Sequence, residues 1–179
     1  MKVKFGLKNV HFAVLNEENN TYATPVALPG AVSLSIDAEG EESNFAADDN
    51  PKYFSKFVNN GYSGSLEVAL LNEAFLTTVL GQTKDSNGAI IENANDVAKP
   101  FALLFEVEGD TEGRRTVLYK VTASRPSTEA ETTEDSVEVK TEEINITCSG
   151  NSNGDVKATL DSGATGYSTF FESVYKKTV

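Results

Sequence analysis

The sequence predicts a mostly β protein, an antiparallel β-sandwich or barrel-like domain with one short flanking α-helix over about residues 72–80. Apolar and polar residues alternate with a period of two over most of the chain, turn-forming residues recur at frequent intervals, and a single segment departs from that period. The chain has 179 residues, of which 39% are hydrophobic, so it is long enough for one core and short for two. We therefore expect one domain spanning residues 1–179.

Four segments alternate clearly enough to be assigned as strands. Residues 32–38, with Val32 facing inward, and residues 65–70 each place apolar side chains at every second position. Residues 101–108 and 114–124 flank the loop Gly-Asp-Thr-Glu-Gly, whose glycines allow the positive φ angles of a tight connection. These two segments predict a central hairpin, and alternation in the second of them predicts one dry face and one wet face.

The segment that breaks the period predicts the helix. Asn72 is a favourable N-cap, Glu73 lies at the positive end of the helix dipole, and Gly81 provides the C-terminal stop. The apolar side chains recur at helical spacing on one stripe. The stripe comprises Leu71, Phe75 and Val79, with Leu76 and Leu80 beside it. We expect this helix to pack on the sheet.

Residues 144–148 and 156–160 also alternate, and the turn-forming run 151–155 separates them. Consecutive alternating segments joined by such a turn predict a second hairpin. The apolar set changes parity between residues 137–141 and residues 144–148, so we expect a β-bulge or a bend over residues 141–143.

Residues 37–57 are predicted to form a long loop rich in acidic and aromatic residues. Between positions 37 and 50 there are six acidic residues and no basic one, yet Phe45 lies among them, and Tyr53, Phe54 and Phe57 follow. A loop that is only solvated does not need these aromatic rings, so they indicate a contact surface.

Two further segments lie outside the predicted core. Residues 125–135 are rich in Pro, Ser, Thr and Glu, which predicts an exposed linker. Residues 163–179 form an aromatic C-terminal arm that we expect to dock on another surface.

The charge balance limits the classes of partner. Lys and Arg number 15 against 27 Asp and Glu, and the net charge of −12 argues against a surface that grips nucleic acid. The longest apolar runs are only a few residues, and residues 1–15 lack the features of a secretory signal. We therefore expect neither membrane insertion nor export.

Nothing in the sequence predicts catalysis, a metal site or a cofactor. Cys148 alternates with apolar residues in a predicted strand, which favours a small buried hydrophobe over a reactive thiol. His11 is the single histidine, so metal or catalytic sites that need two imidazoles are excluded. Residues 85–88 and 151–155 resemble the start of a calcium loop but lack its later ligands, and they are interpreted as turns. A glycosidase-like carboxylate pair is a remote alternative.

The sequence resembles the major tail tube proteins of long, non-contractile-tailed phages (siphophages) that infect Gram-positive bacteria. The resemblance begins with the opening KFGLKNVHFAVL and a Pro-containing segment over residues 24–30. It continues through the strand VSLSIDAEGEE, the stretch NFAADDNPKYFSKFVNNGYSGSLEVALL, the predicted helix and the strand FALLFEVEG. It therefore covers most of the chain.

This resemblance implies a tail tube fold whose subunits assemble into hexameric rings, and rings that stack into a hollow conduit for the genome. The implied partners are further copies of the chain, tail initiator and terminator proteins, and a tape-measure protein, while DNA passes through without sequence-specific binding. The implied location is the virion, after synthesis in the host cytoplasm, and no enzymatic activity is implied. In such proteins the long loop and the terminal arms contact other subunits. The resemblance assigns these roles to the long loop over residues 37–57, an N-terminal arm over residues 1–8 and the C-terminal arm from residue 163. The residues expected at these contacts are Phe45, Asp48, Asp49, Tyr53, Phe54, Phe57, Lys2, Lys4, Lys176 and Lys177.

A second interpretation is a β-sandwich carbohydrate-binding or adhesive module of a virion or a cell surface. Such a module normally displays exposed aromatic residues, especially Trp, on one sheet face, and this chain contains no Trp.

Overall fold

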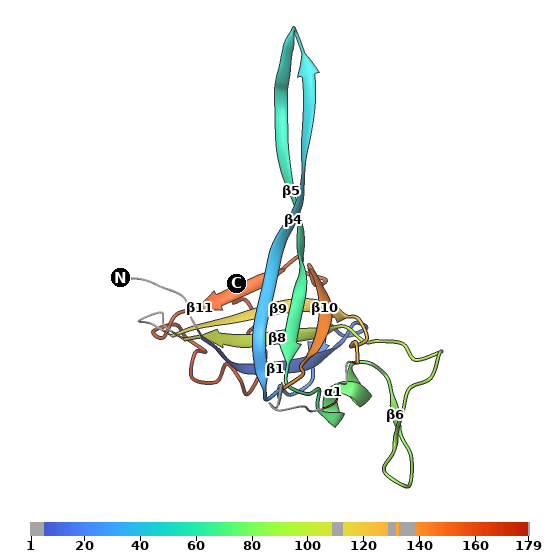
Figure 1. The fold of residues 1–179 in the computed structure, drawn as a ribbon. Coiled ribbons are helices and arrows are strands. Elements are labelled where there is room, and N and C mark those ends of the chain that lie inside the picture. The colour runs from blue at the N-terminus through green and yellow to red at the C-terminus, as the bar shows by residue number, and fades with distance from the viewer. Residues whose placement is uncertain (1–5, 109–112, 129–131, 133–138, 179) are drawn as a thin grey trace.

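The computed structural model describes residues 6–108, 113–128, 132 and 139–178 (Figure 1). Its elements in chain order are β1 (Leu7–Asn16), β2 (Thr21–Tyr22), β3 (Val26–Ala27), β4 (Ala31–Ala47), β5 (Asn50–Val68), α1 (Glu73–Thr78), β6 (Thr83–Lys84), β7 (Ile90–Ile91), β8 (Phe101–Val107), β9 (Arg114–Ala123), β10 (Glu142–Ser149) and β11 (Lys157–Leu160).

The main sheet is antiparallel and curls around a core. Its strand order is β2-β1-β8-β9-β10-β5-β4, with β3 beside β1 and β11 beside β9, while β6 and β7 form a separate small ribbon. The long pair β4 and β5 crosses the strands β1, β8 and β9 at a steep angle (Figure 1). The predicted class, a mostly antiparallel β-sandwich-like fold with one short helix in the described ranges, is confirmed.

The main core lies between the crossing strands and is closed by α1. Phe75 of the helix is fully buried and meets Phe12 and Phe101 edge to face, with ring centres 5.1 and 5.5 Å apart. The side chain of Asn72 accepts the N–H of Phe75 at 2.9 Å, as predicted for an N-cap. Gly81 follows with a φ of 79°, so the predicted helix and both of its boundary signals are confirmed.

A second core covers the opposite face of the sheet. Leu118 and Val121 of β9 face the main core, whereas Val117 and Tyr119 face the second core. The prediction of one wet face on this strand is therefore wrong. A register shift in the pairing of β8 with β9, at residues 118–121 of β9, changes which side chains of β9 point to each face. The C-terminal segment covers the second face, so that face is not wet either.

The predicted hairpin of residues 144–148 and 156–160 is also wrong. β10 pairs with Lys120–Ala123 of β9, and β11 pairs with Arg115–Leu118 of the same strand edge. Both are antiparallel to β9, so β10 and β11 run in the same direction, one after the other. The turn at 151–155 is present, but alternation alone does not say which strand a segment joins.

The expected bulge over residues 141–143 is absent. β10 begins at Glu142, Val139 is 78% exposed outside any strand, and Val137 lies outside the described residues. The change of parity in the apolar pattern therefore marks the point at which β10 begins.

Residues 37–57 form regular structure instead of the predicted loop. β4 and β5 continue as a paired ribbon far beyond the body, and a two-residue turn joins them (Figure 1). Near the other end of β4, a register shift between Ala31 and Ser33 turns Ala31 toward the core. Val32, predicted to face inward, is therefore exposed.

Gly61 lies where the ribbon leaves the body, and we expect its replacement to be costly. Its φ is 99°, and a Cβ at this position would overlap the carbonyl oxygen of Cys148. Gly61→Ala should lower the free energy of unfolding by about 2–3 kcal/mol, measured by urea denaturation. Gly154→Ala is the control because Gly154 has a φ of 81° and open space around it, so it should cost only about 1 kcal/mol of backbone strain. Equal losses would contradict the overlap.

Cys148 is buried as predicted, and we expect its thiol to be unreactive. Burial raises the pKa of the Cys148 thiol to about 11. At pH 8 only about one thiol in a thousand is then ionised, and the thiolate is the reactive form. A maleimide should therefore label the native chain at least about a hundredfold more slowly than the chain unfolded in urea. Similar labelling rates in the two states would contradict this prediction.

Candidate assembly surface

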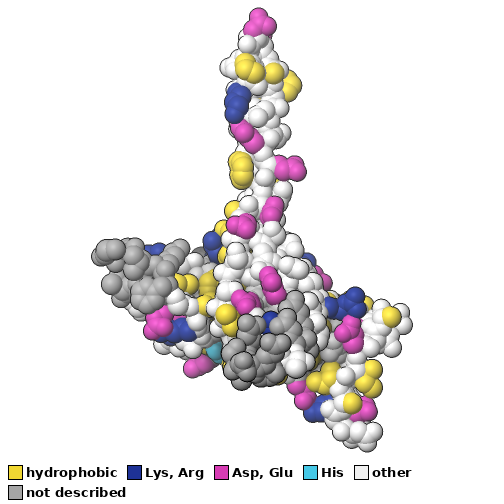
Figure 2. Space-filling model, in the orientation of Figure 1, with side chains coloured by type: hydrophobic (Ala, Val, Ile, Leu, Met, Phe, Trp, Pro, Cys, Tyr) yellow, Lys and Arg dark blue, Asp and Glu magenta, His cyan; other side chains and the backbone are white. Residues whose placement is uncertain are grey.

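The outer part of the β4–β5 ribbon, residues 39–59, stands clear of the body and is called here the projecting hairpin (Figure 1). Figure 2 shows hydrophobic side chains spaced along it and acidic side chains at its tip and along its length. Its exposed apolar side chains are Phe45, Tyr53, Phe54, Phe57 and Val58. The four aromatic residues are predictable from the sequence as contacts, whereas Val58 is not; its pairing with Glu41 places it on the same ribbon.

The tip is a two-residue turn formed by Asp48 and Asp49. Their φ angles are 49° and 56°, and Ala47 pairs with Asn50 across the turn. Positive φ at both central residues defines a type I′ turn, whose twist matches that of paired strands. The two predicted carboxylates therefore lie at the outermost point of the hairpin.

The register divides the projecting hairpin into two faces, because residues directly opposite each other point to the same side. Phe45 lies opposite Phe54, and Ser43 lies opposite Lys56 on that side, so we call this the Phe45 face. The other side is the Phe57 face. It carries Glu42, Asn44, Ser55 and Phe57, while a register shift opposite residues 51–53 leaves Tyr53 outside the regular pairing.

Side-chain contacts join the two strands of the projecting hairpin. Glu42 accepts hydrogen bonds from the Ser55 hydroxyl at 2.7 Å and from Lys52 Nζ at 3.1 Å. The Ser55 hydroxyl and Lys52 hold the pKa of the Glu42 carboxyl below its ordinary value. A Cβ at Gly40 would lie 2.5 Å from Cε1 of Phe57, so this ring covers the glycine. The aromatic side chains are thus presented on an ordered support.

Two of the four predicted lysines lie in the described structure, away from the projecting hairpin. Lys176 and Lys177 are exposed at the end of the C-terminal segment, on the body. No hydrogen bond or ion pair joins either of them to the projecting hairpin in the described structure. Lys2 and Lys4 lie outside the described residues.

An almost buried ion pair fixes the C-terminal segment, residues 163–178, on the second core. Arg115 Nε donates to Glu106 Oε2 at 3.0 Å, and only 9% of the Glu106 side chain is exposed. The guanidinium also donates to the carbonyl oxygen of Tyr167 and lies 4.0 Å from that ring and 4.9 Å from the ring of Phe171. Since Phe170 is buried as well, the predicted C-terminal arm covers its own body.

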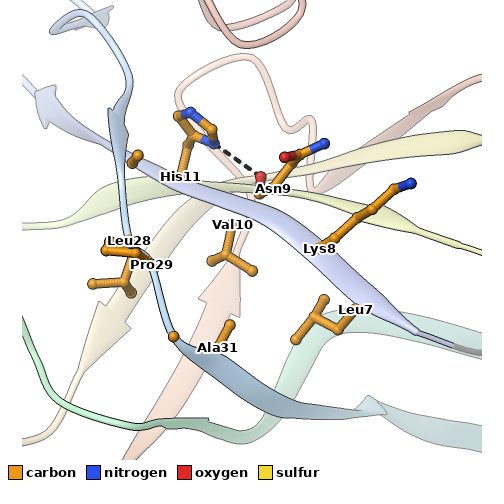
Figure 3. Close-up of a pocket in the computed structure, with 10 residues that line it drawn as sticks. Leu7, Lys8, Asn9, Val10, His11, Leu28, Pro29 and Ala31 are labelled. Atoms are coloured by element: carbon orange, nitrogen blue, oxygen red, sulfur yellow. Dashed lines mark hydrogen bonds between the residues drawn. The ribbon is translucent and has the colours of Figure 1, made fainter.

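A shallow hollow of about 310 Å³ lies between β1 and the segment that leads into β4 (Figure 3). His11 and Val10 point to opposite sides of β1, so the imidazole is turned away from Val10 and Pro29 (Figure 3). His11 Nδ1 lies 2.9 Å from the carbonyl oxygen of Asn9, and its ring centre lies 4.7 Å from that of Phe171. The imidazole is engaged in these structural contacts.

No helix in the described ranges is long and apolar enough to cross a membrane. No group of three or more His, Cys, Asp and Glu side chains in these ranges is arranged to hold a metal ion.

A long ribbon with exposed aromatic residues indicates a surface that contacts other macromolecules. A family model described as phage tail tube protein matches residues 1–167, and the chain belongs to this family. It is therefore a structural component of a phage tail. The comparison with curated protein sequences gives no match.

Three solved structures from contractile injection systems are distantly similar, each with 11% sequence identity. The anti-feeding prophage baseplate, 6-fold symmetrised, contains a chain with a TM-score of 0.41, and the match covers 92% of this chain and 100% of that one. The sheath/tube terminator of an extracellular contractile injection system in its extended state has a TM-score of 0.43, and the match covers 89% of this chain and 99% of that one. The tube-terminating cap of the anti-feeding prophage has a TM-score of 0.34, and the match covers 90% of this chain and 95% of that one.

Proposed function

We propose that this chain is the building block of the tail tube of a siphophage that infects Gram-positive bacteria. Its copies form hexameric rings, and the rings stack into a hollow conduit through which the genome is delivered. The observation that carries the proposal is the projecting hairpin, whose four aromatic side chains are 54–70% exposed in the isolated chain. Membership of the tail tube family supports the same role.

The geometry of the hairpin suits an open assembly. A ribbon that extends away from the body can contact a different surface on another copy, and such a contact is heterologous when that copy does not return it. Such contacts close into rings in one direction and continue as a stack in another. The acidic tip formed by Asp48 and Asp49 is complementary to exposed basic side chains such as Lys176 and Lys177 on a neighbouring body.

The acidic composition suits a conduit for DNA. With a net charge of −12, the wall repels phosphate groups, whereas each basic contact on a wall would add affinity and slow the passage of DNA. The same excess charge keeps free subunits apart until assembly begins. The chain therefore works without enzymatic activity and without reading DNA sequence. Its partners are the tail initiator and terminator and the tape-measure protein.

Negative-stain electron microscopy of the concentrated protein over a range of ionic strengths tests the proposal. Added salt screens the repulsion between subunits, so we expect rings or hollow tubes to increase with ionic strength. Compact monomers under every condition, also in the presence of a tail initiator, would overturn it. Binding to a host glycan array would then favour the carbohydrate-binding interpretation.

A further inference from the structure

We propose that Asn87 is the site at which the folded chain deamidates spontaneously, because the small ribbon that carries it opens, while the fold protects the other two Asn-Gly steps. Asn-Gly occurs at residues 60–61, 87–88 and 153–154. The inference concerns the chemistry of the single chain and does not depend on the proposed function.

The reaction needs only the chain and water. The backbone nitrogen of the glycine loses its proton and bonds to the side-chain carbonyl carbon of the asparagine, and the side-chain nitrogen leaves as ammonia. Water then opens the cyclic imide to aspartate or to isoaspartate, in which the backbone passes through one extra carbon. Glycine favours the attack because it has no Cβ to obstruct it. A glycine N–H that is held in a hydrogen bond must first be released by local opening of its segment.

Asn87 and Asn153 lie in loops that have the same hydrogen bonds. The first residue of each loop, Asp85 or Asn151, accepts through Oδ1 the N–H groups of the residues two and four positions later, at 2.8–3.0 Å. Its carbonyl oxygen accepts the N–H of the glycine. Both asparagines are exposed, and a serine precedes each of them. The two loops therefore share their local structure and the sequence Ser-Asn-Gly, and they differ in their surroundings.

The loop that carries Asn87 belongs to the less stable part of the fold. It joins β6 to β7, which form a ribbon of two residues per strand outside the main sheet. Figure 1 shows this ribbon extending away from the main sheet, beside α1. A short isolated ribbon is marginally stable, so its hydrogen bonds open readily. The Gly88 N–H lies 3.1 Å from the carbonyl oxygen of Asp85.

The loop that carries Asn153 is anchored at both ends. It connects β10 to β11, and both strands pair with β9 of the main sheet. The Gly154 N–H donates to the carbonyl oxygen of Asn151 at 2.8 Å, a shorter bond than that of Gly88. Opening of this loop therefore disturbs the main sheet and is rarer.

Asn60 is protected most strongly, because Gly61 is buried. The Gly61 N–H donates to Asn59 Oδ1 at 2.9 Å, and the backbone of Gly61 packs against the carbonyl oxygen of Cys148. Asn60 is the extra residue of a bulge in the pairing of β5 with β4. Attack by the Gly61 nitrogen requires β5 to separate from β10. The fold thus prevents an isoaspartate from lengthening the backbone where the projecting hairpin leaves the body.

Peptide mapping by mass spectrometry tests the inference. The full-length chain is kept in mildly alkaline buffer, either folded or unfolded in guanidinium chloride, and aspartate and isoaspartate are measured over time at the three positions. In the unfolded chain, the three Asn-Gly steps should react at similar rates. In the folded chain, we expect Asn87 to react at least about fivefold faster than Asn153 and at least about twentyfold faster than Asn60.

Asp85→Asn is the matched variant, because it gives the first loop the same four residues, Asn-Ser-Asn-Gly, as the second. Asn87 should still react at least about fivefold faster than Asn153 in the folded variant, since the ribbon is unchanged. A fall to the rate of Asn153 would assign the difference to residue 85 and overturn the inference. A folded chain in which Asn153 or Asn60 reacts as fast as Asn87, or in which all three are equally protected, would also overturn it.

Discussion

Phe45→Asp and Tyr53→Asp are each expected to leave the subunit folded and to stop tube growth. Both side chains are about 60% exposed in the isolated chain, so each change should alter the free energy of unfolding by no more than about 0.5 kcal/mol. In the tube, each change buries an unpaired carboxylate at a subunit contact, which costs about 3 kcal/mol or more. Since about 1.4 kcal/mol is a factor of ten, the concentration needed for assembly should rise at least a hundredfold.

The control is Val97→Asp, which replaces an even more exposed apolar side chain away from the projecting hairpin. It adds the same charge, so it reports the general effect of a more negative subunit. Circular dichroism and urea denaturation measure folding, and sedimentation velocity with electron microscopy measures assembly. Normal tubes from Phe45→Asp or from Tyr53→Asp would remove that residue from the interface.

The helix α1 is predictable from the sequence because its signals are local. The Asn72 cap, the buried stripe through Phe75 and the stop at Gly81 all lie within ten residues and do not depend on the rest of the fold. The central pairing of β8 with β9 is predictable for the same reason, since a short Gly-containing connection joins the two strands.

The projecting hairpin is predictable as a contact segment but not as a pair of strands. A period of two is visible in a sequence only when one face is dry and the other wet, and both faces of residues 39–59 carry aromatic and charged residues. The sequence does contain one signal for a hairpin at this place. Asp48 and Asp49 suit a two-residue turn, and Phe45 and Phe54 lie on either side of it.

The long-range arrangement around β9 is beyond what alternation can predict. The pattern shows that residues 144–148 and 156–160 are strands, but only the fold shows that both pair with β9. The aromatic residues after position 163 indicate that the C-terminal segment docks on a surface. That this surface is the second face of its own sheet follows from the contacts of Arg115 and Phe170.

Arg115→Ala is expected to lower the free energy of unfolding by about 3 kcal/mol, because it removes the shortest charged contact of the almost buried Glu106 carboxylate. Glu106 would keep Asn9 at 3.4 Å and Lys8 at 3.6 Å, both longer than the 3.0 Å bond to Arg115. The change also removes the hydrogen bond to Tyr167 and the contacts with two aromatic rings. The C-terminal segment should therefore be cleaved much faster in limited proteolysis.

Arg114→Ala is the matched control because it removes the same side chain one residue earlier. Arg114 Nε lies 2.8 Å from Asp161 Oδ1, but 53% of the Asp161 side chain is exposed, and exposed ion pairs contribute at most about 1 kcal/mol. Urea denaturation of the two variants should separate them by about 2 kcal/mol, with rapid cleavage of the C-terminal segment only in Arg115→Ala. If the two variants lose the same stability, Arg115 does not hold this segment on the second core. Its docking then depends on the burial of Phe170 and Val174 alone.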